Sequence, residues 1–317
     1  KIISELKKKE KPKKILAAYH TQGGHPNSCY EGYIHGLRQL GHDVDWINSW
    51  SLWQAPQTGY DLLIQFDCCD DYAPPVNLKY PNVYWAYDNW QNPTNNRQFD
   101  YEPDGQFSRQ GYYIGRAKMA NWVFSMSAIG CKNYAQNGIK SYYLPIGADE
   151  RLLVSDNEHH QKDYIVACIS TYWHMAHQNN RRGELADFLQ KQFPNKHFIT
   201  SGAVYYEQTR LYARSKIVWN YSPCGFDVLN FRVWEALISG TPFLTNDIIK
   251  NQIEALGYQD RLNFYKDDES DLMRAVNEIL ENYQSAFIKA HDAKLFTLTK
   301  HTMRHRMEEM LQIVGMK

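Results

Sequence analysis

Two carboxylate residues stand eight positions apart in this sequence, Asp227 and Glu235. The residues between them are largely apolar and the run ends in Ser239-Gly-Thr-Pro242, so we predict a helix over 228–239. Residues eight apart lie on nearly the same face of a helix, ~12 Å apart along its axis. If Asp227 lies at the helix start, the two carboxylates can bind opposite ends of one elongated, hydroxyl-rich ligand.

The backbone at the start of this helix suits an anion. The N–H groups of Val228 and Leu229 would point between the two carboxylates, just after a loop that ends at Phe226. Helix N-termini bind phosphate groups through such N–H groups and the helix dipole. A ribose, a diphosphate and a second sugar fit this arrangement, so the segment predicts a nucleotide-sugar site. Two simpler interpretations compete with it: a solvated helix face, and N-capping by Asp227.

At these residues the chain resembles the group 1 glycosyltransferases of GT-B fold. Their donor site carries a Glu, seven residues and a second Glu, usually followed by Ala-Met-Ala-Ser-Gly-x-Pro. Here Glu235 is followed by Ala236-Leu-Ile-Ser-Gly-Thr-Pro242. The resemblance implies that Glu235 accepts hydrogen bonds from the ribose and that Asp227 holds hydroxyls of the transferred sugar. Asp227 is one methylene shorter than the usual Glu, which indicates a different sugar, such as a pentose, or a rotated pose.

Cationic side chains are needed near the diphosphate, because negative charge builds up on it as it leaves. The candidates are Arg181, Arg182 and Arg232, together with Ser170 at the start of the loop that follows the second domain's first strand. The resembling enzymes have an Arg after that strand. The loop here, 170–180, is longer than usual, so the choice among the three arginines stays open, and Arg232 could equally pair with a carboxylate.

The acceptor side is expected in the first domain. His20 ends the first strand and Asp88 ends a later one, so both should lie at the ligand-facing edge of a parallel sheet. Either could remove the acceptor proton in an inverting reaction. In a retaining reaction, which the resemblance favours, the leaving phosphate takes that proton. The resembling enzymes generally need no bound metal, so we expect none here and interpret Asp67–Asp71 as a strand-end turn.

Strand-like and helix-like segments alternate along the chain, which is typical of parallel sheets with crossover helices. Together with the resemblance, this predicts an α/β protein of GT-B fold, with two Rossmann-like domains facing a central cleft. We expect a basic leader at 1–14, an N-terminal acceptor domain at 15–150 and a nucleotide-sugar domain at 151–300. The last segment, 301–317, is expected to form a helix that crosses back to the first domain.

Four landmarks give a closer resemblance, to the CgeB-like (spore-protein-like) branch of these enzymes. Each is weak alone, and their order and spacing carry the likeness. They are Leu40-Gly-His42, Tyr84-Trp-Ala-Tyr-Asp88, Leu144-Pro-Ile-Gly-Ala-Asp149 and Arg232-Val-Trp-Glu-Ala236.

Composition limits the partners. The chain has 317 residues, zero formal net charge and 43% hydrophobic residues, without a run of the ~18 apolar residues that a membrane span needs. Residues 1–14 hold seven Lys and two Glu, a charge of +5, so the remaining residues sum to −5. This negative charge disfavours extensive contact with the phosphate backbone of a nucleic acid. The six cysteines form no Cys-x-x-Cys and there is no secretory signal, so we expect a cytoplasmic protein.

The predicted activity is transfer of a sugar from a nucleotide-sugar, a UDP- or GDP-sugar, to an acceptor hydroxyl, with retention and without a further cofactor. The acceptor could be a saccharide, a polymer or modified DNA. Three alternatives remain: a phage-type enzyme acting on hydroxymethylated bases in DNA, a nucleotide-sugar epimerase, and a non-catalytic sugar-binding protein. The sequence leaves the oligomeric state open.

Overall fold

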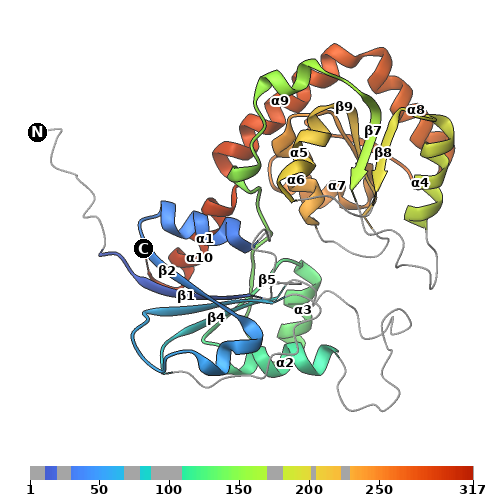
Figure 1. Cartoon of the computed structure of the whole chain (residues 1–317). Helices are drawn as coiled ribbons and strands as arrows, with labels where there is room; N and C mark the ends of the chain where they lie inside the picture. Colours follow the sequence, from blue (N-terminus) through green and yellow to red (C-terminus); the bar gives the residue numbers. More distant parts are fainter. Residues whose placement is uncertain are drawn as a thin grey trace, which may run out of the picture.

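A computed structural model of the chain describes residues 11–19, 30–67, 79–86, 109–169, 181–200, 205–222 and 229–316. They form two lobes, each built on a parallel sheet (Figure 1). Within these residues, no helix combines the length and the apolar character needed to cross a bilayer.

The first lobe contains a six-stranded sheet in the order β2-β1-β3-β4-β5-β6. Strand β1 is buried from Ile15 onward, as expected for a parallel strand covered on both faces. Helix α1 follows β1, and the 3-10 helix η2 follows edge strand β2. The elements are β1 (Lys14–Tyr19), α1 (Tyr30–Gln39), β2 (Asp43–Asn48), η2 (Ser49–Gln54), β3 (Leu62–Asp67), β4 (Asn82–Ala86), α2 (Arg109–Met119), β5 (Trp122–Ser125), α3 (Ala128–Gln136) and β6 (Tyr142–Tyr143).

The second lobe contains a five-stranded sheet in the order β11-β10-β9-β7-β8, also parallel. Short 3-10 helices η4 (Glu150–Leu152) and η5 (Asp156–His160) lead into it. The elements are β7 (Tyr164–Ile169), α4 (Arg181–Gln192), β8 (His197–Thr200), α5 (Tyr205–Ala213), β9 (Ser215–Asn220), α6 (Phe231–Ser239), β10 (Phe243–Asn246), η6 (Asp247–Ile249), α7 (Lys250–Ala255), β11 (Asn263–Tyr265), α8 (Glu269–Glu281), α9 (Tyr283–Lys300) and α10 (Met303–Ile313).

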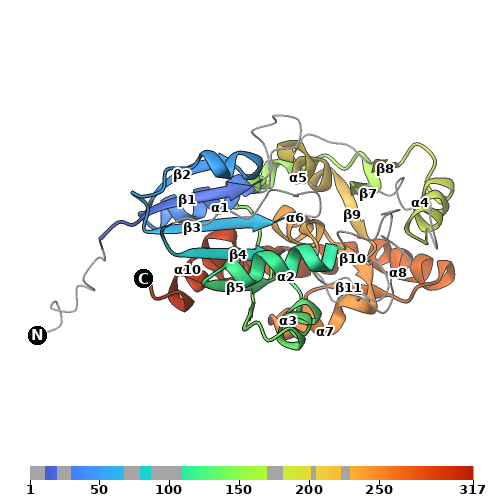
Figure 2. The same ribbon diagram turned by 90° about the horizontal axis from the view of Figure 1, so that it is seen from below.

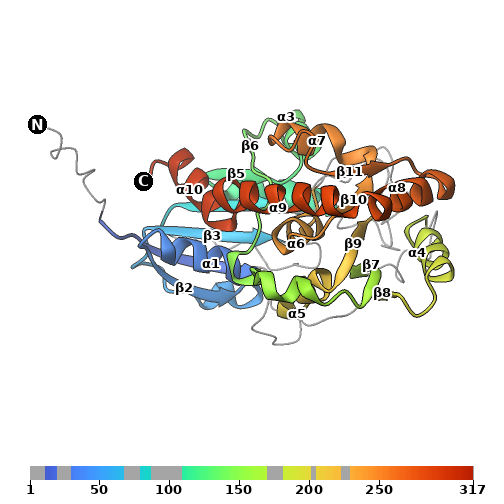
Figure 3. The same cartoon turned by 90° about the horizontal axis from the view of Figure 1, so that it is seen from above.

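The final helix returns to the first lobe. Helix α9 runs along the second lobe and α10 continues from it to pack beside α1 (Figure 3). The chain approaches closely here: a Cβ on Gly147 would lie 2.7 Å from the Thr302 backbone, and one on Gly36 would lie 2.8 Å from the Arg304 Cα. Glycine is therefore required at both contacts. Hydrogen bonds between Ala148 and residues 301 and 303 complete the join.

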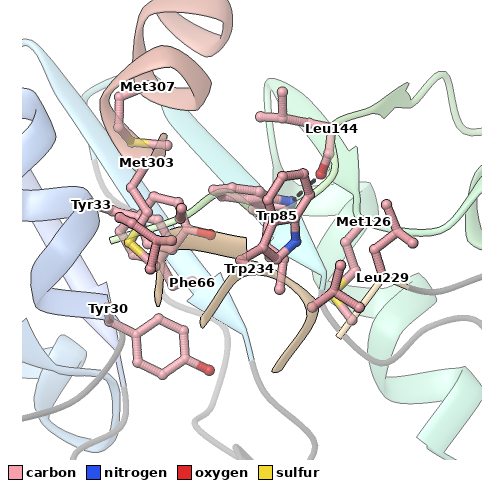
Figure 4. Packing of buried hydrophobic residues seen from close by; sticks show 14 of the residues in the cluster. Tyr30, Tyr33, Phe66, Trp85, Met126, Leu144, Leu229, Trp234, Met303 and Met307 are labelled. Carbon is pink, nitrogen blue, oxygen red and sulfur yellow. Dashed lines mark hydrogen bonds between the residues drawn. The ribbon is translucent and has the colours of Figure 1, made fainter. Parts of the chain in front are cut away.

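One hydrophobic core cluster spans both lobes. Tyr33, Phe66 and Trp85 come from the first lobe, Trp234 comes from α6, and Met303 comes from α10 (Figure 4). The Trp85 indole donates to the Leu144 carbonyl at 3.2 Å. Burial of such large side chains is the main term that holds elements together, so the lobes are joined by apolar packing as well as by the chain.

Candidate functional site

The predicted nucleotide-sugar helix is α6, and it begins later than the sequence prediction. Asn230 is the N-cap: its side chain accepts from the Val233 N–H at 3.2 Å. The helix starts at Phe231, so the predicted start at 228 is wrong, and the Val228 and Leu229 N–H groups are not in its first turn. The physical reason is that Asn caps as well as Asp does and here supplies the hydrogen bond. The predicted end is confirmed, with Gly240 in the left-handed region at φ 72°.

A buried polar network joins the ends of β9 and β10 to the N-cap of α6. The Asn220 amide donates to Thr245 Oγ1 at 3.1 Å, and Asn246 exchanges two 2.8 Å hydrogen bonds with the Ser222 backbone. Asn230 in turn donates to Asn220 Oδ1 at 3.5 Å. These residues lie at the carboxyl ends of β9 and β10, the edge where open α/β sheets bind ligands. Sequence reasoning missed their roles, although three of them are Asn or Thr at strand ends and Asn230 is a helix N-cap.

Glu235 lies inside α6 and is buried, 8% exposed. With the Gln208 amide in its hydrogen-bonding orientation, Gln208 Nε2 donates to both Glu235 carboxylate oxygens, at 3.1 and 3.0 Å. Burial raises the pKa of Glu235 to about 7, with Arg232 opposing the increase and Asp149 adding to it. Hydrogen-bond donors such as Gln208, or the hydroxyl groups of a ligand, favour the charged form of a carboxyl group and so oppose this increase. Gln208 is a further residue that the sequence did not reveal.

One candidate arginine, Arg232, lies within electrostatic reach of this carboxylate, and a second, Arg182, lies within reach of Arg232. Arg232 Nε donates to the Ile169 carbonyl at the end of β7, and Arg182 Nε donates to the Tyr221 carbonyl at 3.2 Å. Burial, followed by repulsion from Arg232, lowers the pKa of Arg182 to about 10. The two guanidinium groups are thus close enough to repel one another at the carboxyl ends of β7 and β9. A pair of half-buried cations at this edge matches the charge of a diphosphate.

Arg181 faces elsewhere. Its guanidinium pairs with Glu184 at 3.0 Å and Asp267 at 3.2 Å, and lies 3.8 Å from Glu269. These acids belong to α4 and to the segment at the start of α8. Of the predicted phosphate ligands, the structure therefore brings Arg232 near Glu235 and Arg182 near Arg232, and it leaves Arg181 among carboxylates.

The remaining predicted residues divide into two groups. The Leu229 side chain is 2% exposed and packs in the core with Trp234 and Met126, so it is a core residue of this region (Figure 4). Six others lie outside the described residues: His20, Asp88, Ser170, Phe226, Asp227 and Val228.

An ion network joins the lobes near this site. Arg151 pairs with Asp149 at 2.6 Å and with Glu31 of α1 at 3.0 Å, and it donates to the Tyr206 hydroxyl of α5 at 2.9 Å. Tyr205 also donates to Asp149, at 3.1 Å. Because Asp149 adds to the pKa of Glu235, this network lies within electrostatic reach of the α6 carboxylate. It links both lobes to the candidate site.

Comparisons with known proteins bear on this arrangement. Residues 181–312 match the family "Glycosyl transferase-like", which covers most of the second lobe and the final helices and less than half of the chain. No curated protein sequence matches the chain.

Solved structures match over almost the whole chain. Anabaena Alr3699/HepE in complex with UDP and glucose aligns with a TM-score of 0.64, 12% identity, 96% of this chain and 99% of that chain. An alpha-glucosyltransferase in complex with UDP and a 13-mer DNA containing a HMU base aligns with a TM-score of 0.65 and 10% identity. The alignment covers 96% of this chain and 100% of that chain. Sucrose-phosphate synthase from Thermosynechococcus elongatus aligns with a TM-score of 0.62 and 10% identity. The alignment covers 96% of this chain and 98% of that chain.

These likenesses confirm the predicted fold class, because two parallel α/β sheets in this arrangement match glycosyltransferases over nearly their full length. The CgeB-like branch is not specifically shown by these comparisons. The chain thus has the GT-B fold, and its residues 181–312 are similar to the glycosyl transferase-like family.

Proposed function

We propose that the protein transfers a sugar from a nucleoside-diphosphate sugar to an acceptor hydroxyl. The observation that carries the proposal is the position of buried Glu235 near Arg232, together with Arg182, whose guanidinium lies near that of Arg232 at the carboxyl ends of β7 and β9. A carboxylate binds ribose hydroxyls, and paired cations bind a diphosphate. The HepE and alpha-glucosyltransferase structures contain UDP, so a UDP-sugar is the first donor to test.

In the proposed reaction, the bond between the anomeric carbon and the acceptor oxygen forms while the bond to the donor phosphate oxygen breaks. The leaving diphosphate gains negative charge, which Arg182 and Arg232 stabilise from fixed positions. In the retaining course the acceptor proton passes to that phosphate oxygen. Asp227 is proposed to hold the transferred sugar, and His20 and Asp88 stay candidates for a base in an inverting course.

The acceptor is proposed to be a saccharide, although one matching structure contains DNA. The chain outside residues 1–14 carries −5, which disfavours a polyanion. A cytoplasmic location is proposed on the cysteines: they form no paired motif, and Cys168 is a buried thiol.

The test begins with calorimetric titration of UDP, GDP and ADP. We expect micromolar binding of one of them, and weakening by ~1–3 kcal/mol in Glu235→Gln, the usual cost of losing a charge-assisted hydrogen bond. Glu281→Gln, at an exposed position of α8, is the matched control. Mass spectrometry after incubation with a panel of nucleotide-sugars then identifies the donor through its hydrolysis.

Two results would count against the proposal. If none of the three nucleotides binds, a non-catalytic sugar-binding protein becomes the better interpretation. If Glu235→Gln binds the nucleotide as tightly as the unmodified protein, Glu235 is not a ribose ligand. Asp227→Ala should lower turnover far more than nucleotide affinity, and equal losses would contradict its role at the transferred sugar.

A further inference from the structure

Two exposed tryptophans lie three residues apart on η2, which follows the carboxyl end of β2. Trp50 is 49% exposed and Trp53 is 63% exposed. Side chains at i and i+3 are eclipsed in a 3-10 helix, so the two indoles lie along one side of η2. The opposite row, Ser49 and Leu52, is buried, and Leu52 packs in a core cluster of the first lobe.

The helix that carries the two rings is firmly held. The Asn48 side chain caps it by accepting from the Trp50 N–H at 3.0 Å, and Ala55 N–H closes its end on the Leu52 carbonyl at 3.0 Å. The row that faces inward anchors it to the sheet. Exposed aromatic side chains fixed in this way cost solvation free energy, which is why clustered ones mark interaction sites.

The chemistry around the rings selects the partner. From residue 43 to residue 60 the sequence contains two aspartates, Asp43 and Asp45, and no Lys or Arg, and the Lys14 ammonium of β1 lies 3.7 Å from Asp45 and offsets its charge. Gln54, Gln57 and Thr58 are exposed in the same stretch and offer amide and hydroxyl groups. A nucleic acid or an anionic membrane requires basic residues beside the aromatic ones. Indole faces next to neutral hydrogen-bonding groups instead suit the apolar faces and hydroxyl edges of sugar rings.

We propose that Trp50 and Trp53 form an aromatic platform on the first lobe that binds a neutral saccharide chain and thereby holds a glycan acceptor. The acceptor role rests on the proposed glycosyl transfer, whereas the binding of the saccharide does not. The position agrees with that role: η2 follows β2 at the edge where the parallel strands of the first sheet end, and in Figure 2 these strands point toward the second lobe.

Native affinity electrophoresis tests the platform. The full chain is run in gels that contain laminarin, dextran or glucomannan, with polygalacturonate and single-stranded DNA as anionic probes. We expect at least one neutral polysaccharide to retard the protein, and the Trp50→Ala/Trp53→Ala variant to need about tenfold more polymer for the same retardation. The Trp50→Phe/Trp53→Phe variant keeps aromatic faces and should retain most of the effect.

The control variant is Leu153→Ala/Leu295→Ala, which removes two apolar side chains that are 51% exposed elsewhere. It should be retarded like the unmodified protein. Thermal unfolding of each variant checks that the chain still folds.

Several outcomes would overturn the platform. They are the absence of retardation by every neutral polysaccharide, retardation by the anionic probes alone, and a dimer that the double Ala variant dissociates. UDP titration of the same preparation separates this inference from the proposed function. A protein that binds glycan without UDP would refute glycosyl transfer and keep the platform, and one that binds UDP without glycan would refute the platform alone.

Discussion

The replacement Glu235→Gln should change how the stability of the protein depends on pH. In the folded protein the pKa of Glu235 is about 7, compared with an ordinary value of 4.5, because burial disfavours the charged form. At about 1.4 kcal/mol per pKa unit, this difference corresponds to about 3 kcal/mol between the protonated and ionised forms.

The sign follows from proton binding. The folded state binds the Glu235 proton more tightly than the unfolded chain does. Between pH 4.5 and about pH 7 the unfolded state therefore carries fewer protons, and the free energy of unfolding falls as the pH rises. Glutamine removes this dependence. Relative to the unmodified protein, Glu235→Gln should gain up to about 3 kcal/mol of stability as the pH is raised from 4.5 to 8.

Urea unfolding at several pH values, followed by circular dichroism, measures this gain. The quantity of interest is the difference between variant and unmodified protein at pH 8 minus the same difference at pH 4.5, so that pH effects common to both cancel. Glu281→Gln reports the effect of losing an exposed carboxyl group. A difference for Glu235→Gln that stays constant across this range, or that falls with pH, would refute the account of a carboxylate held in a costly buried position.

Three other predictions concern the diphosphate site, the final helix and the link between the lobes. Arg182→Gln and Arg232→Gln should each weaken UDP binding by ~1.5–3 kcal/mol and weaken uridine binding less. Arg181→Gln should leave UDP binding unchanged. Calorimetry with both ligands distinguishes loss of a phosphate contact from general damage to the site. Gly147→Ala should lower the melting temperature, because the new Cβ would lie 2.7 Å from the Thr302 backbone. Gly115→Ala should raise the melting temperature slightly, because this position of α2 has open space around it. Equal effects of the two variants would contradict the close packing of α10. Arg151→Ala should destabilise the protein by ~3–5 kcal/mol in urea unfolding, because it leaves Asp149 buried without its ion pair, and a loss below 1 kcal/mol would show that the network contributes little.

Local signals in the sequence predicted much of the fold. Strand β1 was predicted from its apolar run, and the end of α6 from Ser239-Gly-Thr-Pro242, because burial of a parallel strand and a left-handed C-cap depend on neighbouring residues alone. The start of α6 depends on a competition. Asp227 and Asn230 both suit an N-cap, and the capping hydrogen bond comes from Asn230, which also contacts Asn220 at the end of β9, a long-range contact that local signals do not reveal.

The candidate site was predictable only in part, for the same reason. Glu235 and Arg232 lie one turn apart on a single helix, so the sequence places them together. Gln208 comes from α5, and its contact with Glu235 depends on how α5 packs against α6. Arg181 and Arg182 are adjacent in the sequence, and helix geometry turns their side chains in different directions, toward Asp267 and toward Tyr221.

The electrostatics of α6 favour a ligand site over a structural ion pair. In a structural pair, attraction lowers the pKa of the acid. Here Arg232 opposes the increase but does not overcome burial, and the pKa of Glu235 stays near 7. The pKa of Arg182 is lowered to about 10 by burial and by repulsion from Arg232, so its charged form is also disfavoured. Both pKa shifts arise mainly because burial disfavours a charged group. A ligand that supplies hydroxyl donors to Glu235 and phosphate oxygens to the arginines would relieve both at once, which is the pairing of groups found in a nucleoside diphosphate.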